Sequence, residues 1–165
     1  MTPLLLRFAL CVLAASFVAD GGTRTQPATL LAVIVNKNNP VGNIELAELR
    51  RLILGEVRQW SNNRRVTIVH RDASSAAYSV TLDRVARMTP AEYRRLKLNQ
   101  EFRGEAPSTS KTLNSAKSAC EFVFNVPGAI AVVEASFALQ PPCLELAKVL
   151  SVDNKLPGEA HYSLQ

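Results

Sequence analysis

The chain has 165 residues and a formal net charge of +5, with 47% hydrophobic and 20% charged residues. This length suffices for one domain with a substantial core and is too short for two full domains preceded by a leader. The composition is that of a globular protein. The sequence has no low-complexity segment and no repeat with a period of about 20–50 residues, which excludes solenoids and disordered tails.

Residues 1–22 follow the three-part plan of a secretory signal peptide. Arg7 supplies a positive charge, residues 8–19 form an apolar run, and small residues flank Asp20. The run is short for a membrane span, which needs about 20 residues. An uncleaved anchor or a buried core helix is the alternative. We expect a signal peptide over residues 1–22 and one soluble domain over residues 23–165, periplasmic or secreted.

The first half of this domain begins with a strand followed by a helix. Residues 28–35 are continuously apolar, which is typical of a strand buried on both faces of a sheet. A helix should follow from residue 44 to about residue 54, capped by Asn43 and stopped by Gly55. Residues 66–70 predict the second strand. The next helix should start at Ser74 or Ser75.

Thr89, Pro90 and Glu92 have the spacing of a capping box and predict a further helix, whose buried residues should include Phe102. Residues 105–111 are polar and predict a loop. After a helix from residue 114 or 115, residues 129–133 and 147–152 predict two more strands. Strands that alternate with helices predict an α/β fold, with a mainly parallel sheet and helices on both faces. Ligands of such folds bind at the carboxyl ends of the strands.

Two cysteines, Cys120 and Cys143, remain after the leader. In an oxidising compartment they could form a disulfide whose loop closure contributes about 3 kcal/mol. Cys120 also falls on the apolar face of the predicted helix, which suits an unpaired core residue. The sequence leaves both interpretations open.

Positive charge is concentrated in one part of the chain. Between Glu45 and Arg103 there are 12 Lys and Arg residues but 7 Asp and Glu residues. A basic surface attracts anions, and for an exported protein small oxyanions, acidic polymers or anionic lipids are better candidates than nucleic acid. A solvated face without a ligand is the alternative.

A search for catalytic or metal-binding patterns is negative. The sequence contains no HExxH, CxxC, GxSxG, GxGxxG or Walker motif, and its two histidines are too few for a zinc site. His70 is interpreted as the end of a strand. We therefore expect no enzyme activity and no cofactor.

One group of residues has the chemistry of an anion site. Arg71 ends the second predicted strand just before a helix N-terminus, where backbone N–H groups are unpaired. The Arg71 guanidinium, the hydroxyls of Ser74 and Ser75, and the N–H groups from Ser75 to Ala77 could together hold an oxyanion. Without such a ligand, the serines would serve as an ordinary helix cap.

Residues 29–162 resemble the substrate-binding proteins of phosphate ABC transporters. The similar stretches are VIVN at 33–36, NPV at 39–41, IELAELRRLILG at 44–55, Trp60, VTIVHR at 66–71, PGAIAV at 127–132, VLSVD at 149–153 and LPG at 156–158. The resemblance implies one lobe of a two-lobed periplasmic binding protein of type II, with its crossing strands.

The resemblance also implies a phosphate-binding segment, Arg-x-x-x-Ser-Gly-Thr, which here runs from Arg71 to Ala77. The Arg and Ser are present, whereas Ala76 and Ala77 replace the Gly and Thr. We expect an exported domain that binds phosphate or a similar oxyanion for uptake or sensing, with ABC transporter membrane subunits or another envelope protein as partner. The alternative is an interaction module that keeps the fold without the ligand.

Overall fold

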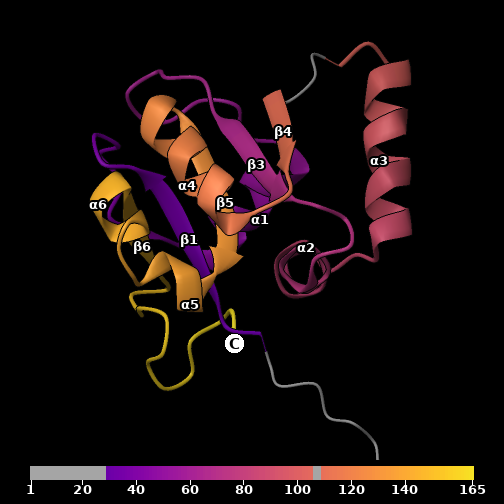
Figure 1. The fold of residues 1–165 in the computed structure, drawn as a ribbon. Coiled ribbons are helices and arrows are strands. Elements are labelled where there is room, and N and C mark those ends of the chain that lie inside the picture. Colours follow the sequence, from indigo (N-terminus) through magenta and orange to yellow (C-terminus); the bar gives the residue numbers. More distant parts are fainter. Residues whose placement is uncertain (1–28, 106–108) are drawn as a thin grey trace, which may run out of the picture.

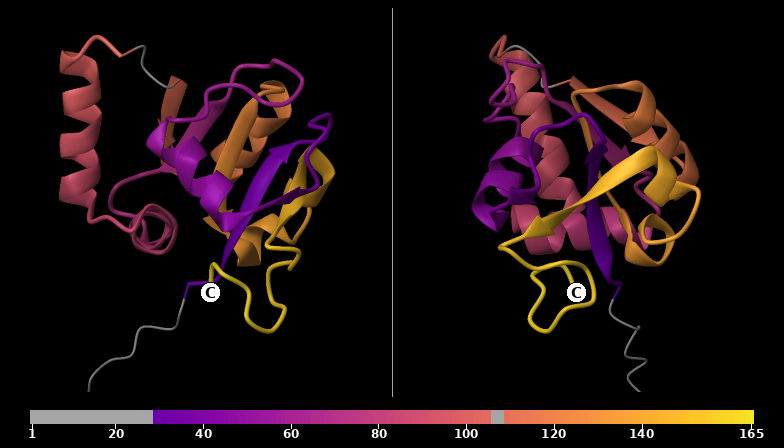
Figure 2. Two further views of the ribbon diagram at one scale, coloured as in Figure 1. Left: turned by 180° about the vertical axis from the view of Figure 1, so that it is seen from behind. Right: turned by 90° about the vertical axis from the view of Figure 1, so that its left-hand side faces the viewer.

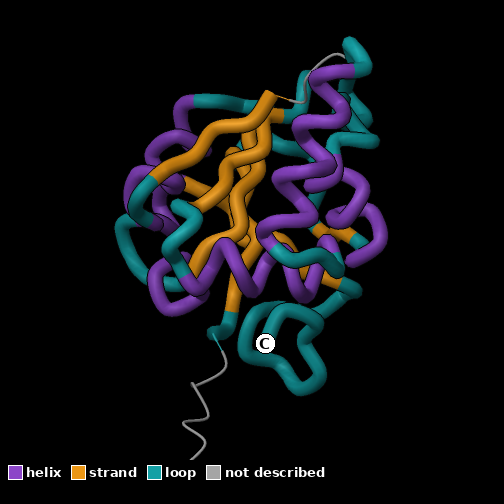
Figure 3. The backbone as a smooth tube through the Cα atoms, turned by 90° about the vertical axis from the view of Figure 1, so that its right-hand side faces the viewer, coloured by secondary structure: helices purple, strands orange, loops and turns teal. Residues whose placement is uncertain are grey.

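The computed structural model describes residues 29–105 and 109–165, so the expected signal peptide lies outside the described residues. These residues form a six-stranded sheet between two layers of helices (Figures 1 and 3). The predicted α/β class is confirmed. In chain order the elements are β1 (Leu31–Asn36), β2 (Asn43–Ile44), α1 (Leu46–Leu54), β3 (Thr67–Arg71), α2 (Ala76–Thr81), the π-helical turn η1 (Leu82–Ala86), α3 (Pro90–Phe102), β4 (Thr109–Leu113), α4 (Ala116–Asn125), β5 (Ala129–Glu134), α5 (Ala135–Ala138), α6 (Cys143–Leu146) and β6 (Ala147–Val152).

The strand order is β2-β6-β1-β5-β3-β4. Strand β3 runs parallel to β4 and β5, and β2 runs parallel to β6. Strand β1 is antiparallel to both of its neighbours, β5 and β6. The sheet is therefore mainly parallel, as predicted, with one reversed strand at its centre.

The apolar run of β1 lies inside the sheet and is buried on both faces, as its sequence predicts. Leu31, Val33 and Val35 belong to the core under α1, α2 and η1. Ala32 and Ile34 face the second core, under α4, α5 and α6. The two helical layers therefore pack on opposite faces of the sheet (Figure 2).

The start of the first helix differs from the sequence prediction. Asn43 and Ile44 form β2 and pair with Ser151 and Val152, so α1 begins at Leu46. Instead of capping the helix, the Asn43 side chain accepts hydrogen bonds from the Ser151 hydroxyl and the Asn154 amide. The other end is as predicted: Gly55 ends α1 in a left-handed conformation, with φ of 82°.

Strand β4 occupies part of a segment that the sequence predicts to be a loop. The five residues TSKTL contain one apolar side chain, and four of the five are exposed. They pair with β3 at the edge of the sheet, where no buried face demands apolar residues. This prediction was wrong because hydrophobic patterning does not detect a polar edge strand.

Helix α3 has the predicted capping box, in which Thr89 and Glu92 bond each other's backbone N–H groups. The helix lies to the side of the sheet rather than on a face of it (Figures 1 and 2). Tyr93 is its buried residue, whereas Phe102 is 87% exposed, which contradicts the expectation that Phe102 is buried. Among the residues that the structure describes, no helix is long and apolar enough to cross a membrane.

Candidate functional site

The carboxyl ends of three parallel strands meet at one edge of the sheet. Strand β3 ends at Arg71, which is paired in register with Leu113 at the end of β4, and β5 ends at Glu134. Helices α2, α4 and α5 begin within a few residues of these ends. In open α/β sheets this edge is where ligands bind. The predicted site residues around Arg71 therefore lie at the expected edge.

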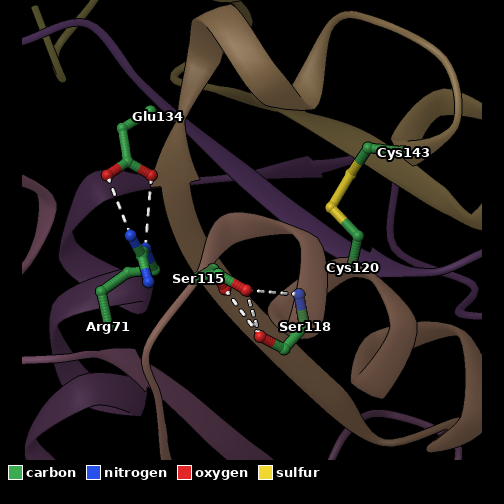
Figure 4. The surroundings of a disulfide bond; sticks show 6 residues. All are labelled: Arg71, Ser115, Ser118, Cys120, Glu134 and Cys143. Atoms are coloured by element: carbon green, nitrogen blue, oxygen red, sulfur yellow. Dashed lines mark hydrogen bonds and ion pairs between the residues drawn. A yellow bond between two sulfur atoms is a disulfide. The ribbon is translucent and has the colours of Figure 1, made fainter.

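Arg71 is held at this edge by a carboxylate. Its Nε and Nη2 atoms each donate a hydrogen bond of 3.3 Å to Glu134, and Nη1 donates one of 3.2 Å to the Leu113 carbonyl. Figure 4 shows the two side chains facing each other. The Arg71 side chain is 10% exposed and that of Glu134 is 27% exposed. The guanidinium is therefore fixed in orientation, and two of its five N–H groups remain outside these bonds.

The loop between Arg71 and α2 is bonded to itself through Asp72. The amide and hydroxyl of Ser74 both donate to the Asp72 carboxylate, at 2.8 and 2.5 Å. These hydrogen bonds, first that of the Ser74 hydroxyl and then that of its amide, lower the pKa of Asp72. This carboxylate therefore carries a negative charge at neutral pH. The Ser74 hydroxyl is thus engaged with a carboxylate, and the loop adds negative charge beside Arg71.

Ser75 caps helix α2. Its hydroxyl donates to the Asp72 carbonyl at 2.7 Å and accepts from the Tyr78 amide at 3.2 Å. Ala76 and Ala77 follow in the first helical turn, where N–H groups have no partner within the helix. The Ala77 side chain is buried in the core, whereas Ala76 is exposed. What these two residues can offer a ligand is their backbone N–H groups.

Helix α4 brings a second capped N-terminus to the same edge, although the sequence does not predict it as part of the site. Ser115 caps it by accepting a hydrogen bond of 3.0 Å from the Ser118 amide, and the two hydroxyls also bond each other (Figure 4). Glu134 was missed as well. Its signal was available in the sequence, because it is a charged residue at the end of a strand whose other residues are apolar and buried.

Cys120 of α4 and Cys143 of α6 form a disulfide, with 5.6 Å between their Cα atoms (Figure 4). Both residues are buried in the core on this side of the sheet. The two interpretations of Cys120 are thus compatible, since the residue is both a core residue and a disulfide partner. The bond fixes α4, whose N-terminus reaches the site edge, to α6, the short helix directly before β6.

His70 directly precedes Arg71 in β3, and its ring packs edge-on against Tyr78 of α2 and Tyr93 of α3. It is buried, and its Nε2 lies 3.0 Å from the Tyr93 hydroxyl, which itself donates to the Ile53 carbonyl at 3.0 Å. Burial, with a smaller effect of Lys97, lowers the pKa of His70 to about 4. The neutral ring serves as a packed core residue. Within residues 29–105 and 109–165, no three His, Cys, Asp or Glu side chains could hold a metal ion.

A family model described as a PBP superfamily domain matches residues 28–162. The chain belongs to this family. This PBP superfamily domain has no match among curated protein sequences. Its fold is also found in solved structures, and the three described next are each less than 25% identical to it.

Three of these structures illustrate the similarity. An ABC-type phosphate transport receptor from Vibrio cholerae is 18% identical to this chain, with a TM-score of 0.62. The match covers 82% of this chain and 52% of the receptor. PstS from Borrelia burgdorferi is 20% identical with a TM-score of 0.62, and the match covers 78% of this chain and 49% of PstS. The third is a putative phosphate ABC transporter substrate-binding protein from Clostridium perfringens with bound phosphate. It is 19% identical with a TM-score of 0.58, and the match covers 75% of this chain and 45% of that protein. This PBP superfamily domain therefore spans about half the length of these structures, which corresponds to a single lobe.

Proposed function

We propose that the chain is a non-catalytic binding protein that holds phosphate or a similar small oxyanion at Arg71 and the start of α2. The observation that carries this proposal is the position of Arg71, at the carboxyl end of β3 and directly before a helix N-terminus. Of the solved structures with this fold, one is named as a phosphate transport receptor, and another is a putative phosphate ABC transporter substrate-binding protein with bound phosphate. Both points support the same class of ligand.

The donors available to an oxyanion are backbone and guanidinium N–H groups. Arg71 retains two N–H groups outside its bonds to Glu134 and Leu113. The amides of Ala76 and Ala77 add two donors in the first turn of α2, where the helix dipole favours a negative charge. Replacement of Gly and Thr by alanine leaves these amides in place.

The affinity should be low, in the millimolar range. The carboxylates of Glu134 and Asp72 lie beside the guanidinium and oppose a further negative charge. A single lobe also leaves the bound anion in contact with water, where each charged contact contributes little. In this role the domain would work outside the cytoplasm in uptake or sensing, with ABC transporter membrane subunits or another envelope protein as its partner.

Calorimetric titration of the purified chain with phosphate, and with sulfate for comparison, tests this proposal. We expect saturable binding of phosphate that weakens by at least about tenfold in Arg71→Ala, which corresponds to about 1.4 kcal/mol. Arg64→Ala is the matched control, because Arg64 is an exposed arginine of the loop before β3 and should leave binding unchanged.

Amide chemical shifts provide a second measurement that suits weak binding. Phosphate should shift the Ala76 and Ala77 amide resonances more than those of Glu121 and Asn125, at the far end of α4. Equal affinity in Arg71→Ala would contradict the assigned site. No response of the unmodified chain to millimolar phosphate would favour an interaction module that keeps the fold without the ligand.

A further inference from the structure

A groove lined by four arginines lies between α1 and η1, and it shares no residue with the Arg71 site. Arg50 and Arg51 come from α1, and Arg84 and Arg87 come from η1 and the residue that ends it. The groove has a volume of about 510 Å³. This size falls within the range of pockets that bind drug-sized molecules or short peptide segments. We call it the arginine groove.

Two of these arginines have carboxylate neighbours and two do not. Arg51 lies 3.7 Å from Glu56, and Arg84 lies 3.7 Å from Asp83. Exposed pairs of this kind contribute about 0–1 kcal/mol, so they compete only weakly with another carboxylate for the arginine. Arg50 and Arg87 are exposed and make no ion pair with a residue that the structure describes. The groove therefore keeps an excess of positive charge.

Apolar side chains lie between the guanidinium groups. Ala47 and Leu54 of α1 occupy the same helical face as the two α1 arginines, at spacings of three and four residues. Leu46 and Ala47 give the groove accessible apolar surface, because Leu46 is half-buried and Ala47 is exposed, whereas Leu54 and Val85 lie buried beneath them. A ligand that fills the groove therefore meets an apolar floor and charged walls.

Arg87 occupies a backbone conformation that arginine seldom adopts. Its φ of 57° lies in the left-handed region, where glycine or asparagine is usual and other residues are strained. It follows directly on a π-helical turn, a rare structure that often marks functional sites. An arginine at a position where glycine would be less strained favours a role for its side chain.

We propose that the arginine groove binds an acidic segment of a partner protein, in which Asp or Glu residues alternate with apolar ones. Guanidinium groups pair bidentately with carboxylates, and the floor accommodates the apolar side chains. Polyphosphate has no apolar groups to cover this floor, and the flat surface of a bilayer does not enter a concave groove. A lone small anion would be held weakly in so exposed a place, whereas a peptide combines several contacts.

Fluorescence anisotropy with a labelled peptide of repeated Asp-Glu-Leu triplets tests the proposal on the full chain. We expect saturable binding that falls with rising salt and weakens by about tenfold or more in the double variant Arg50→Gln/Arg87→Gln. The matched control is Arg64→Gln/Arg65→Gln, which removes the same charge from two exposed arginines outside the groove. This control should bind within about twofold of the unmodified chain.

Three results would overturn the proposal. Equal weakening in the two double variants would show a general attraction to basic protein. Unchanged affinity for a peptide with Ser in place of Leu would show that the apolar floor is unused. Competition by pyrophosphate at a lower concentration than by the unlabelled peptide would show a small-anion site. Because Arg71→Ala leaves the groove intact, peptide binding should survive in that variant, which separates this proposal from the phosphate site.

Discussion

Glu134 binds the Arg71 guanidinium through two hydrogen bonds of 3.3 Å, which join the ends of β5 and β3. This pair has two opposite effects on a bound oxyanion. It fixes the arginine in position, which lowers the entropy lost on binding, but it also places a carboxylate next to the anion. The second effect acts through charge and can be removed without removing the side chain.

Glu134→Gln should therefore strengthen phosphate binding several-fold, because glutamine keeps one oxygen as an acceptor for Arg71 and removes the negative charge. The same change should lower the free energy of unfolding by about 1–3 kcal/mol, since the lost bonds involve a charged pair that is partly buried. Calorimetric titration and urea unfolding measure the two effects. Glu121→Gln, on the exposed side of α4, is the control, and unchanged phosphate affinity in Glu134→Gln would place the anion elsewhere.

The Tyr93 hydroxyl connects α3 to both α1 and β3. It donates to the Ile53 carbonyl and lies 3.0 Å from His70 Nε2. Tyr93→Phe should lower the free energy of unfolding by about 1–3 kcal/mol, because a buried carbonyl and a buried ring nitrogen lose their partner. Urea unfolding measures this. Tyr78→Phe is the matched control and should change stability little, since the Tyr78 hydroxyl bonds no described residue; an equal loss in both variants would contradict the assigned role.

His70 should make stability depend on pH in the weakly acidic range. Burial lowers the pKa of His70 from 6.5 to about 4, so between these values the unfolded chain binds more protons than the folded chain. The contribution of His70 to the free energy of unfolding should therefore be greatest above about pH 6.5. It should decrease by up to about 3 kcal/mol as the pH falls toward 4.

Urea unfolding at several pH values would measure this dependence. In His70→Gln the slope between about pH 6.5 and pH 4.5 should be reduced, because no group at this position then titrates. His161→Gln removes the exposed second histidine and should retain the slope. Parallel curves for both variants would assign the pH dependence to other groups.

The bond between Cys120 and Cys143 closes a loop with a sequence separation of 23 residues. Its removal in Cys120→Ala/Cys143→Ala should lower the free energy of unfolding by about 3 kcal/mol, mainly through a less restricted unfolded chain. Thermal unfolding with and without reductant measures the effect. Reductant should lower the melting temperature of the unmodified chain and leave that of the double variant unchanged. A melting temperature unaffected by reductant in both proteins would contradict a stabilising disulfide.

Arg87→Gly should raise the free energy of unfolding by about 0.5–1 kcal/mol, because glycine adopts a φ of 57° without strain. The same variant should bind the acidic peptide more weakly than the unmodified chain. Higher stability together with weaker peptide binding is the result expected if the Arg87 side chain serves binding rather than folding. A loss of stability would instead show that the Arg87 side chain contributes to the fold.

The sequence is most informative where residues are buried on both faces or where a cap has a fixed spacing. The unbroken apolar runs identified β1 and β5, and the Thr89 capping box located the start of α3. The reversed direction of β1 was not predictable, because a strand buried on both faces has the same pattern in either orientation. Strand β4 was not predictable either, since its residues are polar and exposed at the edge.

The candidate site was partly predictable for a similar reason. Arg71 and the cap at Ser75 follow from local spacing along the chain. The pairing of Arg71 with Glu134 joins residues 63 positions apart and depends on the order of strands in the sheet. Without that order, the sequence shows a free arginine, whereas the folded protein has one whose charge is largely compensated.

Helix α3 is attached to the rest of the domain mainly through the end of α1. Lys97 and Gln100 both donate to the Leu54 carbonyl, beside the Tyr93 bond to Ile53, and most of the helix is exposed. The part of the β3–β4 connection that contains α3 is thus a module with few contacts to the sheet. Additional residues inserted near Gly104, beyond these contacts, would extend the module without entering either core, which makes this position suitable for fusing a reporter or a second lobe.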